Sequence, residues 1–471
     1  MADTPTNDFA LPDLSAVSVS AIGDIFSSPL SLFQSSSCNV SPKSSTLLSQ
    51  LQAALSSLDL SVTVPAHSEI SVLGYTTVDA DTFSGKYSLG MPALQESLEN
   101  AVGLSIAIAI GIVIAAICYL FLLPAQEQRP HRTLLIGSIL CIIIGILPYV
   151  LIDAIGIQNT AVRFSIVCPF VVYLFRTLEA MTGFVPKGRD ASFRLYCIYF
   201  AAPAELLYDD KTQKLIQATK VDMIQSFFDL VKCIMSITLL CSVFTSSGYQ
   251  PFGESNAGEF FEGVVVGDVL DIRHLGNNFV MAFFFQSGLA LGFSVMGHSV
   301  QMMTGYKVLK AMRNPLLEAT SVAEFWGRRW NLLIHHVLKR GVYKPVRKYA
   351  SALTASLAVF IASGLFHEWM VHAAFLYKRE NTEGVVSGSN TAFFVWNFVI
   401  IACERMLVST KAAKSLGRVL PQFMITFFVI MCALPLAHWF GWPYLRANFF
   451  SDYEALVPVV RHVQIDITTV M

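Results

Sequence analysis

The chain has 471 residues, of which 54% are hydrophobic and 14% charged. Soluble domains carry about 25% charged residues, so this composition argues against a soluble protein and predicts an all-α protein that crosses a membrane several times. A net charge of −1 argues against nucleic acid as a partner. The nine cysteines show no paired spacing, which predicts neither a disulfide framework nor a zinc site.

Residues 1–98 differ from the rest of the chain. They are rich in serine, contain only Lys43 and Lys86 as cations, and have no long apolar run. Their start lacks the basic and apolar regions of a secretory signal. We predict a mostly disordered N-terminal tail over 1–98, with a short helix near 47–58. A membrane domain over 99–445 and a short C-terminal tail over 446–471 follow.

Apolar spans recur after residue 100, and each is long enough to cross about 30 Å of hydrocarbon at roughly 1.5 Å per residue. The span that contains Asp229 and Lys232 is the least apolar of them. We predict about eight membrane helices, at 101–123, 134–156, 161–183, 221–243, 277–297, 349–376, 391–409 and 420–441.

The loop charges predict an orientation. Lys and Arg gather in the loops after the first, third, fifth and seventh spans, whereas the loop 244–276 is acidic. Because cytosolic loops are enriched in cations, we expect both termini on the lumenal side. The sequon at 39–41 would then face the lumen, and we expect the membrane to be that of the endoplasmic reticulum.

The segment 298–348 is too polar to cross a membrane. Trp326, Trp330 and Leu333 recur near helical spacing, with cations among them. This pattern is typical of a helix that lies at the cytosolic interface or re-enters the membrane there.

Ionisable side chains interrupt the sixth span at His367, Glu368 and His372. Such groups cost roughly 2.5–3.5 kcal/mol each on insertion scales, so they usually mark a functional interior. A buried neutral imidazole can take a proton from a hydroxyl, which is the work of a general base. The alternative for His367, weighted equally, is a structural hydrogen bond to a neighbouring helix. Glu368 is a structural partner, an acid kept neutral, or an aid to orientation.

The histidine spacing argues against a metal. A zinc-binding helix needs histidines four positions apart, whereas His367 and His372 are five apart and point about 140° from each other. His335 and His336 are adjacent and also diverge, so we predict no metal site. His462 and Asp466 match the HxxxD pattern of some soluble acyltransferases. No Gly follows them and no soluble domain surrounds them, so we attribute this match to chance.

Polar groups in the interfacial segment have two interpretations. The amide of Asn331 can donate to a carbonyl oxygen or hold a base in place. Arg328, Arg329, Lys339 and Arg340 can bind phosphates. They can equally be the ordinary charges of a cytosolic loop in contact with lipid headgroups. The residues alone leave both interpretations open.

Two motifs resemble a known family. FWGRRWN at 325–331 is similar to a signature of the wax-synthase-like branch of the membrane-bound O-acyltransferases. SGLFHE at 363–368 resembles the second signature of that superfamily, which carries its histidine. Asn331 and His367 are 36 positions apart, a spacing typical of the superfamily, inside a signature region over 313–372.

The resemblance implies a bundle of membrane helices around an internal chamber. Acyl-CoA would enter this chamber from the cytosol and a lipid alcohol from the bilayer. His367 would be the general base and Asn331 its polar partner. Arg328, Arg329 and Trp330 would lie at the mouth that receives acyl-CoA. The resemblance implies no cofactor, since acyl-CoA is a co-substrate.

We therefore expect an acyl-CoA-dependent O-acyltransferase that esterifies a long-chain fatty alcohol to a wax ester. Sterols, diacylglycerol and terpenoids are alternative acceptors. We expect direct transfer, because no Ser or Cys adjoins His367 in sequence, although Ser363 lies one turn away. A non-catalytic lipid or solute carrier is the alternative of another class, with His367 and Glu368 as a proton relay.

Overall fold

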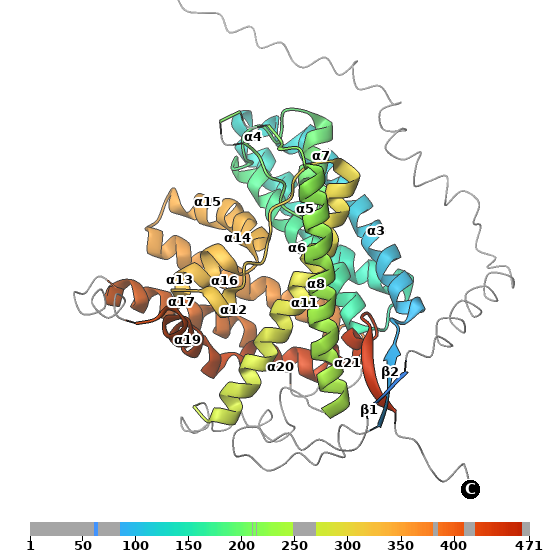
Figure 1. The fold of residues 1–471 in the computed structure, drawn as a ribbon. Helices are drawn as coiled ribbons and strands as arrows, with labels where there is room; N and C mark the ends of the chain where they lie inside the picture. The colour runs from blue at the N-terminus through green and yellow to red at the C-terminus, as the bar shows by residue number, and fades with distance from the viewer. Residues whose placement is uncertain are drawn as a thin grey trace, which may run out of the picture. The chain divides into compact units, whose positions relative to one another are not determined.

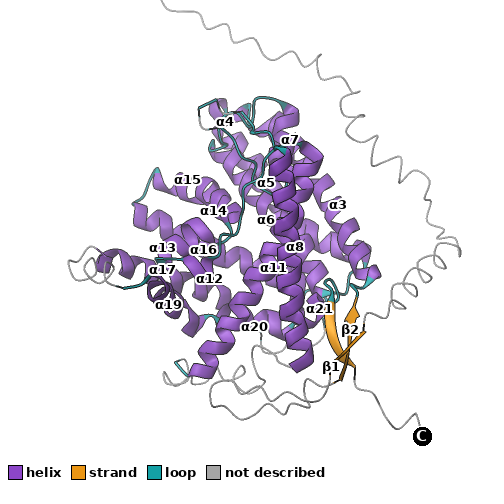
Figure 2. Ribbon diagram, viewed as in Figure 1, coloured by secondary structure: helices purple, strands orange, loops and turns teal. Residues whose placement is uncertain are grey.

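The computed structural model describes residues 61–64, 85–209, 211–212, 214–247, 270–379, 385–408 and 420–463. This part of the chain is built mainly from helices, joined by loops and one small group of strands (Figure 1, Figure 2). The predicted helix at 47–58 and the sequon at 39–41 lie outside the described residues.

Six helices are long and apolar enough to cross a membrane. They are α3 (Leu94–Ile117) with its π-helical continuation η3 (Cys118–Leu122), α5 (Pro130–Ile155), α6 (Thr160–Thr182), α8 (Lys220–Ser247), α11 (Ile272–Thr304), and α16 (Ala352–Val371) with η6 (His372–Leu376).

A seventh candidate span is bent by 55°. It joins α19 (Gln422–Ala433) and the 3₁₀ turn η7 (Leu434–Leu436) to α20 (His438–Arg446). The predicted span at 391–409 is α17 (Ser389–Val408), which is not among these candidates. The described residues thus contain six or seven candidate spans, and the predicted count of eight is not confirmed.

Helix α6 is the best-buried span. Of its most apolar window, 72% is buried, against 22–44% for the other five spans. It begins at Asn159, whose side chain accepts a hydrogen bond from the Val162 amide, and it ends at Gly183, whose φ of 72° suits a glycine. Packing against α3, α5 and the segment after α14 (Leu332–Leu338) makes α6 the support of the site region.

The interfacial segment is a series of short helices and not one helix. It contains α12 (Pro315–Glu318), α13 (Val322–Glu324), η4 (Phe325–Arg329), α14, η5 (Lys339–Tyr343) and α15 (Lys344–Arg347). Two interruptions have a local cause, because Asn314, before α12, and Asn331, before α14, both adopt φ of 43°. A helix cannot continue through a residue in the left-handed region, so the expected single interfacial helix is divided.

A small antiparallel sheet changes the description of both predicted tails. Strands β1 (Ser61–Val64), β2 (Gly85–Gly90) and β3 (Val459–Val463) pair in the order β1-β2-β3, with Ser88 opposite Arg461. Helix α3 begins at Leu94, before the predicted boundary at 99. The short helices α4 (Ala125–Gln128), α7 (Phe193–Ala201) and α21 (Phe449–Glu454) complete the described fold.

Candidate functional site

His367 lies on α16 with its ring fixed by its own helix. Its Nδ1 is 2.7 Å from the carbonyl oxygen of Ser363, one turn earlier. A carbonyl oxygen only accepts hydrogen bonds, so Nδ1 carries the proton and Nε2 of the neutral ring keeps its lone pair. This tautomer is the one that a general base at Nε2 requires.

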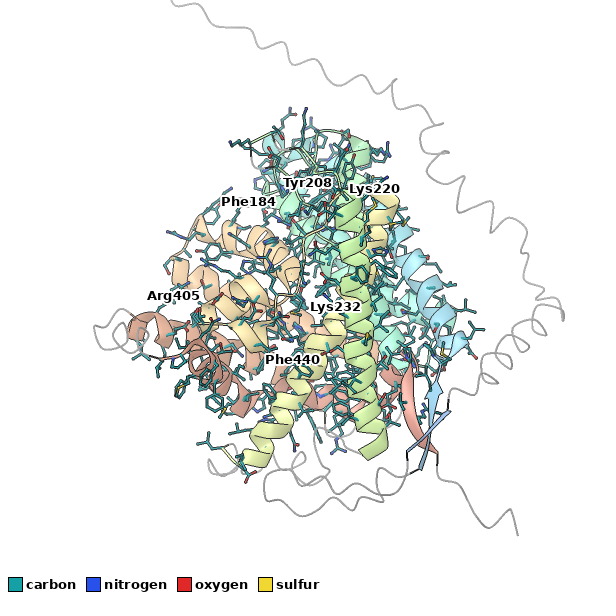
Figure 3. The ribbon with its side chains drawn as sticks, viewed as in Figure 1. Phe184, Tyr208, Lys220, Lys232, Arg405 and Phe440 are labelled. Atoms are coloured by element: carbon teal, nitrogen blue, oxygen red, sulfur yellow. The ribbon has the colours of Figure 1, made fainter. Side chains whose placement is uncertain are left out.

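Aromatic rings from three helices surround this imidazole. The ring of Phe394 on α17 stacks on it at 4.6 Å between centroids, and Phe366 on α16 lies at 4.1 Å. Phe440 on α20, which is labelled in Figure 3, meets it edge-on at 5.2 Å. These contacts fix the plane of the ring and place it in an apolar environment, where an electrostatic interaction is stronger than in water.

The SGLFHE motif brings α17 against α16. A Cβ atom at Gly364 would lie 2.5 Å from the Cα atom of Thr391, so only glycine permits this approach. Glu368 Oε1 accepts a hydrogen bond of 3.1 Å from the backbone amide of Thr391, in the first turn of α17. Of the three interpretations of Glu368, the structure favours a structural partner that orients the neighbouring helix.

The FWGRRWN motif is attached to the same helix. Trp326 Nε1 donates to Oδ1 of Asn397 at 3.0 Å, and Trp326 also lies 5.6 Å from Phe394. Further along α17, both carboxylate oxygens of Glu404 accept hydrogen bonds from α13, from the Val322 amide at 2.8 Å and the Ala323 amide at 2.9 Å. Helix α17 therefore contacts both motifs and holds one relative to the other.

Asn331 caps helix α14 with its side-chain oxygen, and this bond leaves its amide nitrogen uncommitted. It lies between η4 and α14, where its Oδ1 accepts a hydrogen bond of 3.2 Å from the Ile334 amide. Among the described residues no hydrogen bond joins Asn331 to His367. The two are connected through rings, from Trp330 to Trp326, to Phe394 and to His367. The partnership of Asn331 with His367 thus stays a prediction.

The cations of the first motif differ in their partners. Arg329 is bound to two carboxylates, with Nε 2.8 Å from Glu324 and NH1 2.6 Å from Glu318. Hydrogen bonds from Asn314 and Arg329 hold the pKa of Glu318 below its usual range, which keeps this partner charged. Arg329 is thus already neutralised, which disfavours its predicted contact with acyl-CoA.

Arg328 and Trp330, the other two residues of the predicted mouth, are in different situations. The side chain of Arg328 is exposed. The indole of Trp330 stacks on the ring of Phe325 at 5.4 Å, with an angle of 14° between the planes. Arg328 therefore remains a candidate for phosphate binding, whereas Trp330 is in part a packing residue of the motif.

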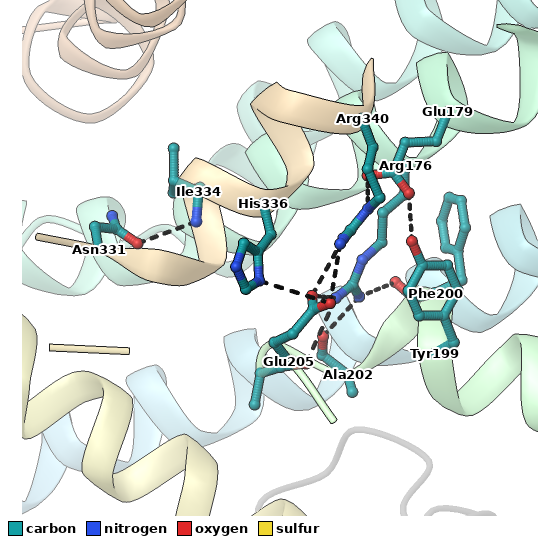
Figure 4. Close-up of polar contacts among 11 residues, drawn as sticks. Arg176, Glu179, Tyr199, Phe200, Ala202, Glu205, Asn331, Ile334, His336 and Arg340 are labelled. Carbon is teal, nitrogen blue, oxygen red and sulfur yellow. Dashed lines mark hydrogen bonds and ion pairs between the residues drawn. The ribbon is translucent and has the colours of Figure 1, made fainter. Parts of the chain in front are cut away.

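A buried ionic network anchors the segment that follows Asn331 (Figure 4). Arg340 on η5 donates to Glu179 on α6 at 2.9 Å and to both oxygens of Glu205 at 3.1 and 3.2 Å. The hydroxyl of Tyr199 on α7 donates to the second oxygen of Glu179. Arg176 lies 3.8 Å from Glu205. The four charges cancel in pairs, as buried charges must.

The same network fixes the ionisation of Glu205, which follows α7. Burial by itself raises the pKa of this carboxyl, but the guanidinium groups of Arg340 and Arg176 together hold it below its usual value. His336 on α14 faces Glu205 at 3.9 Å. The lowered pKa favours the carboxylate form of Glu205, which ties α6, η5 and the segment after α7 together.

Several contacts of the site were not predicted from the sequence. Asn397 and Glu404 are polar side chains inside an apolar span, the same signal that singled out His367, and this signal could have identified them. Arg340 was interpreted as a phosphate-binding cation or as an ordinary loop cation. Its acidic partners lie more than 130 positions away, so no local spacing could have indicated them.

Known proteins share the part of the chain that carries this geometry. Residues 309–396 match the Membrane bound O-acyl transferase family. The match contains both motifs and the first half of α17. The signature region is therefore similar to the membrane-bound O-acyltransferases. The polar contacts of α17 with the two motifs thus lie in the matched segment and in its immediate extension to Glu404.

Relatives with named activities match part of the chain. The chain is 29% identical over 181 residues to the probable long-chain-alcohol O-fatty-acyltransferase 2 of Arabidopsis thaliana, covering 36% of this chain and 49% of that protein. It is 30% identical over 152 residues to the long-chain-alcohol O-fatty-acyltransferase of Simmondsia chinensis, covering 31% and 41%.

A longer match exists at lower identity. The putative long-chain-alcohol O-fatty-acyltransferase 10 of Arabidopsis thaliana is 24% identical over 329 residues, covering 68% of this chain and 85% of that protein. The chain spans about half the length of the first relative named above.

Proposed function

We propose that this protein transfers a fatty acyl group from acyl-CoA to a long-chain alcohol, releasing a wax ester and free CoA. The observation that carries this proposal is the position of His367. Its Nε2 is available as a base, and its ring contacts the helix that also holds the first motif. The relatives named for this activity and the match to the O-acyltransferase family support the same chemistry.

In the proposed reaction, His367 Nε2 takes the proton of the alcohol while its oxygen attacks the thioester carbonyl carbon. The new C–O bond forms and the C–S bond breaks. The imidazolium then gives its proton to the departing thiolate, so that CoA leaves as the thiol and no proton is consumed. No covalent acyl-enzyme is required.

The surrounding residues have supporting roles in this proposal. Asn331 orients the reactants with the amide nitrogen that its capping bond leaves uncommitted. Arg328 binds a phosphate of CoA on the cytosolic side. A proton relay, as a carrier would need, is disfavoured because the Glu368 carboxylate is occupied by the Thr391 amide. We place the enzyme in the endoplasmic reticulum, where both substrates are membrane-associated.

Expression in a cell that lacks neutral-lipid synthesis tests this function. The cells are fed defined fatty alcohols, sterols, diacylglycerol and terpenoid alcohols, and the esters are profiled by mass spectrometry against an empty-vector strain. We expect wax esters from the fatty alcohols. Esters of another fed alcohol would correct the acceptor, and the absence of any new ester would contradict acyl transfer.

A further inference from the structure

Two fully buried asparagines on α17 differ in one respect. Asn390 and Asn397 each have 0% of their surface exposed. Asn397 is satisfied, because it accepts from Trp326 Nε1 and donates to the carbonyl oxygen of Phe393. Among the described residues, Asn390 has neither a donor for its Oδ1 nor an acceptor for its Nδ2. A buried amide without partners is unfavourable for folding, so its presence requires a reason outside the folded chain itself.

The position of Asn390 supplies that reason. It lies four residues before Phe394, the residue whose ring stacks on His367. Residues four apart share one face of a helix, so Asn390 lies one turn along the face that contacts the proposed base. The neighbouring Ser389 hydroxyl, 5% exposed, also has no partner in the part of the chain that the structure describes. Hydrogen-bonding groups thus gather at the N-terminus of α17, beside the apolar rings of the site.

We propose that Asn390 contacts the substrate and that its Nδ2 donates a hydrogen bond to the carbonyl oxygen of the acyl thioester. This oxygen gains negative charge when the alcohol attacks, so a fixed donor stabilises the transition state more than the ground state. The bonds made and broken are those of the acyl transfer above, on which this inference rests. The bound thioester gives the orphaned amide the partner that the folded chain lacks.

The test compares Asn390→Leu with the matched variant Asn397→Leu. Leucine at 390 removes an unsatisfied group, so the melting temperature should stay the same or rise. Leucine at 397 leaves the Trp326 indole without its acceptor, so the melting temperature should fall. We expect Asn390→Leu to lower kcat by about 100-fold or more, with kcat/KM falling equally, as for the loss of an oxyanion donor. Asn390→Ala should show the same kinetics without added side-chain volume.

Two results would overturn this assignment. Turnover by Asn390→Leu and Asn390→Ala within a few-fold of wild type would show that the amide does not contact the reacting atoms. A loss of activity that merely follows a lowered melting temperature would make Asn390 a structural residue satisfied by internal water. Wild-type protein and His367→Ala are assayed beside them. A wild type without transfer refutes the proposed function, whereas normal transfer that depends on His367 but not on Asn390 refutes only this inference.

Discussion

The imidazole of His367 is oriented by a single backbone contact, the Ser363 carbonyl at 2.7 Å from Nδ1. That contact fixes the tautomer, and the rings of Phe366, Phe394 and Phe440 fix the plane. The adjacent Glu368 acts at a distance from the chemistry, since its carboxylate binds the Thr391 amide. At the scale of residues, the SGLFHE motif therefore contains one proposed base, His367, and one side chain that positions the neighbouring helix, Glu368.

The role of Glu368 is tested by two substitutions. Glu368→Gln keeps an oxygen that can accept from the Thr391 amide, so most of the activity should remain. Glu368→Ala removes the cap, which should cost about 0.5–2 kcal/mol of stability and displace Phe394. A displacement of about 1 Å can lower activity about 100-fold. Initial rates and melting temperatures measure both effects, and equal losses for Gln and Ala would show that the charge of Glu368 is needed instead.

The two arginines of the first motif make a second residue-scale pair. Arg328→Ala should raise the KM for acyl-CoA, because a charge-assisted hydrogen bond contributes about 1.5–3 kcal/mol, or roughly 10–100-fold. Arg329→Ala should leave this KM unchanged and lower stability by less than about 1 kcal/mol, since Glu318 is 48% exposed. Steady-state kinetics across acyl-CoA concentrations distinguish them. A larger KM effect from Arg329 would restore its predicted place at the mouth.

At the scale of elements, α17 joins the two motifs and α6 supports them. Contacts of α17 run from Thr391 through Phe394 and Asn397 to Glu404. Phe394, Asn397 and Glu404 follow one another at helical spacing, so one face of α17 carries these three contacts, whereas Thr391 contributes its backbone amide. The span predicted at 391–409 was assigned no role, yet it holds the first motif relative to the second.

The buried network between η5 and α6 allows an element-scale prediction. Arg340→Met should leave Glu179 and Glu205 without their main cation, at a cost of about 3–5 kcal/mol. Lys339→Ala, one position earlier and exposed, should change stability by no more than about 0.5 kcal/mol. Thermal unfolding in detergent measures both. Equal stabilities for the two variants would mean that the network does not anchor the segment.

At the scale of the whole molecule, the general architecture could be predicted from the sequence, and the long-range pairings could not. The apolar runs locate the spans, because the hydrocarbon thickness sets their length. His367 stands out because an ionisable group is rare in such a run. The partners of Arg340 depend on contacts distant in sequence. The pairing of β2 with β3 could not be predicted either, because the two strands come from opposite ends of the chain.

The pairing of β2 with β3 can be tested by cross-linking. Ser88 lies directly opposite Arg461, at the separation of paired strands. Ser88→Cys combined with Arg461→Cys should form a disulfide on mild oxidation, since opposed residues meet the required Cα spacing of about 4.4–6.8 Å. Each single variant serves as a control for the native thiols. Mobility on non-reducing gels reports the bond, and a double variant that behaves like the single variants would contradict the sheet.

The identity of the base is tested most directly with purified protein in lipid nanodiscs. Labelled acyl-CoA and a long-chain alcohol are supplied, and ester formation is followed for wild type and His367→Ala at matched folded fraction. Removal of a general base lowers turnover by about 10²–10⁴-fold, so we expect ester formation by the variant at or below about 1% of wild type. Near-normal turnover by His367→Ala would contradict the account.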